Sequence, residues 1–232
     1  MIAGEVLRVA QRPGGIGTLA IRLLEVRTGR IRTYPRPGGG CWTSAILKEP
    51  VHGPVALTRL GLQGDQVADS KAHGGLDQAV LAYASEHYPV WRSEGIQAWP
   101  GDFGENMLLS GLTDEDACIG DVYALDEVLL QVSQPRQPCT TLALRFQRKD
   151  IVPRVWAGAR GGWYLRVLRE GPVTSGMEWT LVCRPNPGAT VARVLAGFAH
   201  AAQAPAEALL LADLEGLAGT WRTKLKTKAL NE

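Results

Sequence analysis

The chain has 232 residues, of which 45% are hydrophobic and 21% charged, and its formal net charge is +2. This length allows one large domain or a main domain with a small appendage, and the composition is typical of a soluble globular protein. The small net charge argues against a dedicated nucleic-acid-binding protein, which needs a strongly basic face. The sequence has no run of about 20 apolar residues, as a membrane span requires, and its first ten residues lack the apolar core of a signal peptide. We therefore expect a cytoplasmic protein without nucleic-acid or membrane partners.

Short β-like runs separated by glycine-marked turns dominate the chain up to about residue 187. Strands are expected at residues 6–10, 19–27, 55–60, 79–83, 122–124, 128–132, 163–168 and 180–183. Many short strands with such turns favour a barrel or folded sheet over a doubly wound α/β fold. One helix, capped by Ser85 and ended by Gly95, is expected to interrupt the strands.

The pattern changes to short amphipathic helices after the turn-rich residues 184–188. Thr190 is expected to cap the first helix, Pro205 to start the second and Thr220 to open the third. None of the three is long enough to be stable alone, so we expect a small bundle that supports packing or homodimerisation. The last helix carries four basic residues, Arg222, Lys224, Lys226 and Lys228. They could form an anion patch, but a solvated face that complements the helix dipole is the favoured interpretation.

The cysteines are scattered along the chain, at positions 41, 118, 139 and 183. Without a C-x-x-C pair, this pattern suits neither a structural zinc site nor a disulfide framework. Cys139 stands out because it follows an expected strand on a loop stiffened by Pro135 and Pro138. If Arg136 lies close, its permanent charge lowers the pKa of the thiol and favours the thiolate, which attacks electrophiles and binds soft metals. The alternative is a buried cysteine that acts as a small hydrophobe, and the local sequence leaves both interpretations open.

Three glycine-rich segments, at residues 61–65, 73–75 and 101–106, carry polar groups beside the glycines. Such segments let backbone N–H groups approach a phosphate, although any one of these glycines could simply supply a positive φ in a turn. His73 could be a structural histidine, and Lys48 could be a surface lysine or an anion ligand. The sequence contains no G-x-S-x-G, G-x-G-x-x-G, P-loop or H-E-x-x-H motif. A cysteine hydrolase that uses Cys139 with His73 stays open.

Taken in order, these segments resemble the MOSC family, named for the C-terminal domain of molybdenum cofactor sulfurase. The resemblance is carried by Ser44-Ala45-Ile46 with Lys48, the run 61–65, His73-Gly74-Gly75, Phe103-Gly104-Glu105-Asn106, and Ser133-Gln134-Pro135-Arg136 with Pro138-Cys139. Gly162-Trp163-Tyr164 and a three-helix tail containing Trp221 are similar to the YiiM-like branch of this family. One departure is Gly176-Met177-Glu178, where family members often carry an aspartate after the glycine.

The resemblance implies a mainly β fold with some α-helix. Residues 28–187 would form a MOSC β-barrel-like domain and residues 188–232 a three-helix domain, and residues 1–27 an N-terminal extension that could pair with the barrel. It also implies that the protein binds molybdenum cofactor, with Cys139 as thiolate ligand of the metal and with catalytic roles for Cys139, His73 and Arg136. The cofactor-binding residues that it implies are Lys48, His73, Gly74, Gly75, Phe103, Gly104, Asn106, Ser133 and Arg136.

The activity implied by the resemblance is molybdenum-dependent reduction of N-hydroxylated compounds, such as hydroxylaminopurine-like base analogues, to amines. Because the chain shows no flavin, haem or iron–sulfur motif, a separate electron-donating reductase is expected as a partner. The alternative function is a carrier or binding module for molybdenum cofactor or sulfur, which would use Cys139 without reductase turnover of its own.

Overall fold

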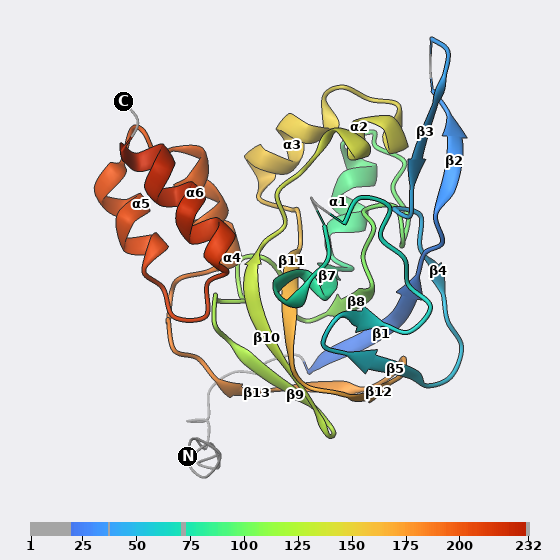
Figure 1. The fold of residues 1–232 in the computed structure, drawn as a ribbon, viewed down its shortest axis with the longest axis horizontal. Helices are drawn as coiled ribbons and strands as arrows, with labels where there is room; N and C mark the ends of the chain where they lie inside the picture. Colours follow the sequence, from blue (N-terminus) through green and yellow to red (C-terminus); the bar gives the residue numbers. More distant parts are fainter. Residues whose placement is uncertain (1–19, 37, 71–72, 231–232) are drawn as a thin grey trace.

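The computed structural model describes residues 20–36, 38–70 and 73–230, and a closed β-barrel forms its centre (Figure 1). The barrel strands are β1 (Ile21–Thr28), β7 (Val80–Ala84), β8 (Met107–Ser110), β9 (Val122–Leu125), β10 (Val128–Pro135), β11 (Trp163–Arg169) and β13 (Glu178–Cys183). They are hydrogen-bonded in the order β13-β9-β10-β11-β7-β8-β1, and pairing of β1 with β13 closes the ring. Neighbours run antiparallel except for β7 and β8, which are parallel. The expected β-barrel-like fold with helices is confirmed.

The inside of the barrel follows from the alternation of apolar residues along its strands. Leu130 and Val132 of β10 and Leu165 of β11 are fully buried, whereas Gln131 between the first two is only half-buried. This period of two is the pattern that predicted the strand at residues 128–132. The strand expected at residues 19–27 is present as β1, and the one expected at residues 6–10 lies outside the described residues.

Shorter strands extend the barrel at one side. Strand β4 (Glu49–Pro50) pairs with β1, and β5 (Val55–Thr58), β6 (Gly61–Leu62) and β12 (Gly171–Val173) form a three-stranded sheet. Strands β2 (Arg32–Pro35) and β3 (Cys41–Ser44) form a hairpin that projects from the molecule in Figure 1. The hairpin leads directly into the segment whose Ala45, Ile46 and Lys48 line the candidate site described below.

Three helices and a 3-10 turn lie between the strands: α1 (His87–Ser93), α2 (Thr140–Phe146), α3 (Ile151–Gly158) and η1 (Leu76–Gln78). The expectation of a single helix in this region was wrong. Helices α2 and α3 are only 7 and 8 residues long, and α3 carries Pro153 and two β-branched residues in its first turn. Proline is tolerated in the first turn of a helix but weakens a helical pattern in the sequence. Their apolar residues Leu142, Ile151 and Val155 pack in a second core around Phe103, so tertiary packing stabilises them.

Helix α1 begins one residue later than a cap at Ser85 would require. Its N-cap residue is Glu86, and no side chain caps the helix, so the expected role of Ser85 was wrong. The end of the helix is as expected, because Gly95 follows it with a φ of 76°.

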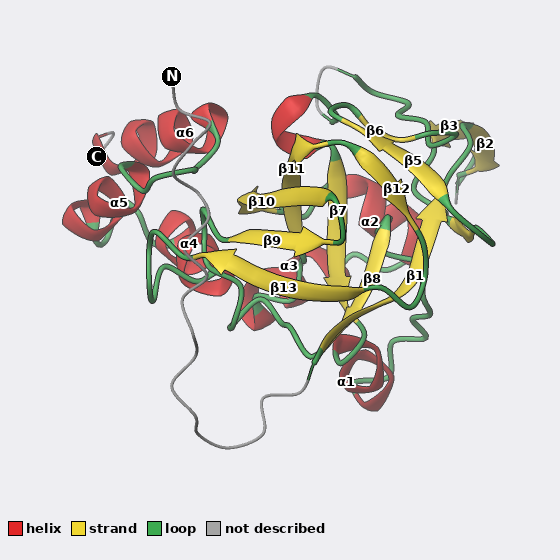
Figure 2. Cartoon of the chain, turned by 90° about the horizontal axis from the view of Figure 1, so that it is seen from below, coloured by secondary structure: helices red, strands yellow, loops and turns green. Residues whose placement is uncertain are grey.

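The tail forms the three expected helices, α4 (Val191–Ala199), α5 (Pro205–Ala212) and α6 (Gly219–Leu230), which lie beside the barrel in Figures 1 and 2. Thr190 caps α4 as predicted, because its Oγ1 accepts a hydrogen bond from the N–H of Arg193 at 3.1 Å. Leu195 and Trp221 belong to the same buried apolar cluster as Leu130 of the barrel. The bundle and the barrel therefore share one continuous core.

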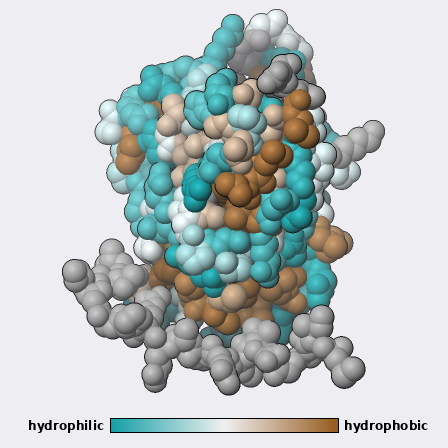
Figure 3. All heavy atoms as spheres, turned by 90° about the vertical axis from the view of Figure 1, so that its left-hand side faces the viewer, coloured by the Kyte–Doolittle hydropathy of each residue, from teal (hydrophilic) through white to brown (hydrophobic). Residues whose placement is uncertain are grey.

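The face of the molecule that carries the bundle shows apolar areas among polar ones (Figure 3). Leu210 on α5 and Leu230 on α6 are both 69% exposed. Homodimerisation through the tail stays a prediction. No helix in the described part of the chain combines the length and apolar character needed to cross a bilayer.

Candidate functional site

A cavity of about 280 Å³ opens where the hairpin, residues 60–69 and 73–74, and the Cys139 loop meet. Its lining brings together residues that lie up to 121 positions apart in the sequence, from Thr43 to Tyr164. Among the predicted site residues, the lining includes Lys48, His73, Gly74, Phe103, Gly104, Arg136 and Cys139. The fold thus gathers most of the predicted residues around one space.

Cys139 lies at the junction between β10 and α2, where it is half-buried. Burial alone would raise the pKa of its thiol. A hydrogen bond from His73, the charge of Arg136 and hydrogen bonds from the side chain and backbone of Thr141 outweigh this effect and lower the pKa to about 6. The thiolate is therefore the main form at pH 7. The electrostatics favour the reactive interpretation of Cys139 over that of a small buried hydrophobe.

Arg136 is the buried cation next to this thiolate. Its side chain is almost inaccessible, with the whole residue 4% exposed, and its backbone N–H donates to the carbonyl of Gly162 at 2.9 Å. The guanidinium also hydrogen-bonds the phenol oxygen of Tyr164. Its Nη1 is buried and has no hydrogen-bond partner among the described residues. A buried donor of a permanently charged group is costly to leave unpaired, so the arrangement suits an anionic ligand in the cavity.

Lys48 occupies another part of the lining and is already paired. Its Nζ lies 2.6 and 2.7 Å from the two carboxylate oxygens of Asp65, and the side chains are only 8% and 12% exposed. Burial lowers the pKa of Lys48, and the charge of Asp65 opposes this effect in part. Asp65 also accepts hydrogen bonds from the N–H of Gly29 at 2.6 Å and from Asn106 Nδ2 at 2.8 Å. Asp65 therefore neutralises Lys48 and fixes its position.

Asp65 is a site residue that the sequence did not predict. The only signal was its place at the end of the glycine-rich run 61–65, eight positions before His73. Its partners Lys48 and Asn106 stand 17 and 41 positions away, so only the fold shows that it lies in the site.

Comparison with known proteins identifies the family of this chain. The family model described as "MOSC domain" matches residues 69–180. The chain is 34% identical to protein YiiM of Escherichia coli (strain K12) over 213 residues, which are 90% of this chain and 92% of that protein. This chain belongs to the MOSC family. The resemblance noted in the sequence, including the YiiM-like branch, is confirmed.

Two further relatives extend the comparison of this MOSC protein. The crystal structure of YiiM from Geobacillus stearothermophilus has a TM-score of 0.75 and 32% identity, covering 90% of this chain and 99% of that one. A protein of Gibberella moniliformis (strain M3125 / FGSC 7600) named "Reductase" is 42% identical over 177 residues. The match covers 74% of this chain and 31% of that much longer protein.

The segment 103–106 of the MOSC protein divides between the cavity and the structure behind it. Phe103 and Gly104 line the cavity, and Gly104 has a φ of +83° with Ile46 Cγ1 only 3.1 Å from where a Cβ would lie. Glu105 is buried and accepts hydrogen bonds from the Tyr88 hydroxyl and from the backbone of Gly101, while burial raises its pKa. Glycine at 104 lets the chain pass close to the cavity wall.

Three predicted cofactor-binding residues lie outside the cavity lining. Asn106 Oδ1 accepts from the N–H of Leu81 at 3.2 Å, and its Nδ2 donates to Asp65 and to the Arg27 carbonyl. Ser133 Oγ donates to the carbonyls of Asp77 at 2.6 Å and Tyr164 at 3.0 Å. Gly75 is exposed and precedes η1 with a φ of 84°. The hydrogen bonds of Asn106 and Ser133 connect neighbouring strands and loops behind the cavity.

Within the described ranges, no group of three or more His, Cys, Asp or Glu side chains is arranged to hold a metal ion. The sulfur of Cys139 is the soft donor on the cavity lining, with His73 beside it. If this thiolate binds a metal ion, the other ligands of the metal would come from the bound cofactor.

The low pKa of Cys139 predicts a distinct pH profile of alkylation. The rate with iodoacetamide should be half-maximal near pH 6 and level off above about pH 7, because only the thiolate reacts. The rate should fall as the pH drops below 6. Site-resolved mass spectrometry of protein produced without the cofactor measures the alkylation rate of Cys139 at each pH. The variant His73→Ala should have its midpoint at higher pH. A midpoint near the pKa of an ordinary thiol, about 8.5, would contradict the described electrostatics.

Proposed function

We propose that this MOSC protein binds molybdenum cofactor in the Cys139 cavity and reduces N-hydroxylated compounds, such as hydroxylaminopurine-like bases, to amines. The observation that carries the proposal is the pairing, in one cavity, of a thiolate at Cys139 with a buried Arg136 donor that has no partner in the described part of the chain. The fungal relative named "Reductase", which shares 177 aligned residues with this chain, supports oxidoreductase chemistry.

The residues of the cavity fit the chemical groups of this cofactor. Molybdenum accepts soft thiolate ligands, and Cys139 would supply one. The cofactor is anionic at its phosphate and dithiolene, and Arg136 Nη1 offers an unpaired positive donor for such a group. Lys48 is expected to contribute less net charge than Arg136, because Asp65 already neutralises it.

The protein's own residues would hold and shield the reacting groups. When bound, the cofactor supplies the two-electron redox change that the reaction needs. The balance is R–NHOH + 2 H⁺ + 2 e⁻ → R–NH₂ + H₂O, in which the N–O bond breaks and the oxygen leaves as water. Arg136 would bind an anionic group of the cofactor, and His73 would keep a hydrogen bond on the sulfur of Cys139. The two electrons would come from a separate electron-donating reductase, since the sequence has no motif for a flavin, haem or iron–sulfur cluster.

The test is metal analysis followed by turnover. Protein from a molybdate-fed host should carry close to one molybdenum per chain, and with dithionite it should convert an N-hydroxylated purine to the amine. Metal without turnover, or a persulfide on Cys139 detected by mass spectrometry, would instead support a carrier of cofactor or sulfur. Turnover in metal-free protein, or an acyl-thiol intermediate on Cys139, would contradict the proposal and support a cysteine hydrolase.

Arg136→Ala should weaken retention of the cofactor about ten- to a hundredfold, because a hydrogen bond to a charged group contributes about 1.5–3 kcal/mol. Molybdenum content after extensive dialysis measures the effect. Arg148→Ala is the matched control, because Arg148 pairs with Asp150 at a more exposed position outside the cavity. Equal metal content in both variants would mean that the anionic group does not bind at Arg136.

A further inference from the structure

Gln78 of η1 brings an unpaired hydrogen-bond acceptor to the cavity lining. Its Oε1 is buried and has no hydrogen-bond partner among the residues that the structure describes. A carboxamide oxygen is costly to bury unpaired, so this position favours a ligand that donates a hydrogen bond. Arg136 Nη1 has the opposite requirement, because a guanidinium nitrogen can only donate. An anionic group bound to Arg136 is an acceptor, so it cannot pair with the oxygen of Gln78.

The main chain on both sides of Gln78 is fixed by the barrel. On one side, the carbonyl of Asp77 accepts a hydrogen bond from Ser133 Oγ of β10 at 2.6 Å. On the other side, Val80 begins β7 and pairs with Leu165 of β11. A carboxamide on such a fixed segment binds a ligand with a smaller loss of conformational freedom.

The cavity lining also provides apolar surface. Leu62, Leu81 and Phe103 belong to it, and each of these residues is at most 4% exposed. Apolar walls with a small number of polar groups are typical of sites for flat organic ligands. A carboxamide offers one acceptor and one donor next to each other, and this pair matches an exocyclic N–H beside a ring nitrogen, as on adenine. The lining therefore suits a nitrogen heteroaromatic ring whose edge faces Gln78.

We propose that Gln78 is a specificity-determining residue that binds the base of the substrate. Its Oε1 would accept from the exocyclic N–H of the base, and its Nε2 would donate to the adjacent ring nitrogen. This inference rests on the proposed function, because it names the part of an N-hydroxylated purine that the cavity recognises. The pterin ring of the cofactor carries the same kind of edge, so the experiment has to separate these two sources.

The first measurement compares Gln78→Met with the parent on two substrates, using molybdenum-loaded protein. One substrate is a purine with a hydroxylamino group on carbon 6, and the other is phenylhydroxylamine, which has the same reacting group but no ring nitrogen. Methionine keeps the length of the side chain and removes both hydrogen bonds. The variant should lose about ten- to a hundredfold in kcat/KM for the purine, the usual contribution of one bidentate contact to a base. With phenylhydroxylamine it should stay within about twofold of the parent.

The second measurement is the affinity for adenine, the amine product, which does not depend on turnover. Equilibrium dialysis should show a Kd about ten- to a hundredfold higher in Gln78→Met than in the parent. Gln78→Glu should also bind adenine more weakly, because a carboxylate cannot donate to the ring nitrogen. Molybdenum per chain should be the same in all three proteins, because the proposed contact is made to the substrate.

Gln63→Met is the matched control, because Gln63 is exposed and lies outside the cavity lining. It should equal the parent in every measurement. A parent that shows no turnover but binds adenine through Gln78 would contradict the proposed reaction and support this inference. Equal adenine affinity in Gln78→Met and the parent, or no adenine binding by the parent, would overturn it. A loss of molybdenum like that expected for Arg136→Ala would also overturn it, because Gln78 would then bind the pterin.

Discussion

Cys139→Ser is expected to abolish molybdenum retention while the protein stays folded. A serine hydroxyl is a harder ligand than a thiol and does not ionise at neutral pH, so it cannot replace the thiolate that this cavity stabilises. The substitution replaces one sulfur atom by a smaller oxygen atom at a half-buried position, so its effect on folding should be small. Molybdenum per chain by elemental analysis and the thermal unfolding curve together measure the outcome.

The other cysteines provide the controls for this prediction. Cys41 and Cys183 are exposed, and Cys41→Ser and Cys183→Ser should keep full metal content and activity. Cys118 is buried, so Cys118→Ser should keep activity in the fraction that folds. Equal metal content and equal turnover of Cys139→Ser and the parent would rule out the proposed metal-ligand role.

Local sequence patterns predicted the elements whose burial follows a regular period. The alternation around Leu130 and Val132 predicted β10, and the cap at Thr190 predicted the start of α4. Helices α2 and α3 escaped this approach, because each makes about two turns and is stabilised by the core around Phe103 rather than by its own sequence. Such contacts cannot be inferred from a single chain segment.

The site shows the same limit for polar residues. The ordered motifs singled out Lys48, His73, Arg136 and Cys139, and the fold gathers these four residues around one cavity. They could not show that Asp65 neutralises Lys48. They also could not show that Asn106 bonds the carbonyl of Arg27, 79 positions away. Motif order thus predicts which residues gather, while the charge that each presents depends on partners that only the fold supplies.

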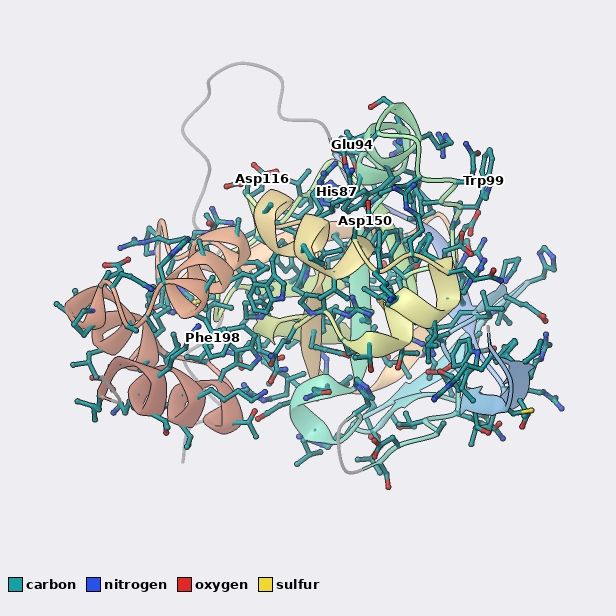
Figure 4. The ribbon with its side chains drawn as sticks, turned by 90° about the horizontal axis from the view of Figure 1, so that it is seen from above. His87, Glu94, Trp99, Asp116, Asp150 and Phe198 are labelled. Atoms are coloured by element: carbon teal, nitrogen blue, oxygen red, sulfur yellow. The ribbon has the colours of Figure 1, made fainter. Side chains whose placement is uncertain are left out.

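Trp221→Ala is expected to destabilise the whole protein by about 3–5 kcal/mol, the usual cost of truncating a buried aromatic side chain. Trp221 on α6 is fully buried and contacts Phe198, with ring centroids 5.3 Å apart. Phe198 in turn stacks near Trp156 of α3 at 5.9 Å and lies on the bundle in Figure 4. These rings join the bundle to the rest of the molecule. Urea unfolding monitored by circular dichroism measures the loss.

Trp99→Ala is the matched control, because Trp99 is 56% exposed and lies on the opposite side of the molecule from Phe198 in Figure 4. Its only described ring partner is Arg92, 4.7 Å from the ring centroid, so its removal should cost less than about 1 kcal/mol. Since bundle and barrel share one apolar core, Trp221→Ala should shift a single cooperative transition rather than create a second one. Metal content per folded molecule should stay unchanged, because none of the described tail residues, up to residue 230, lines the Cys139 cavity. Two separate transitions would show that the bundle unfolds on its own, and a specific loss of metal would place the tail within the cofactor site.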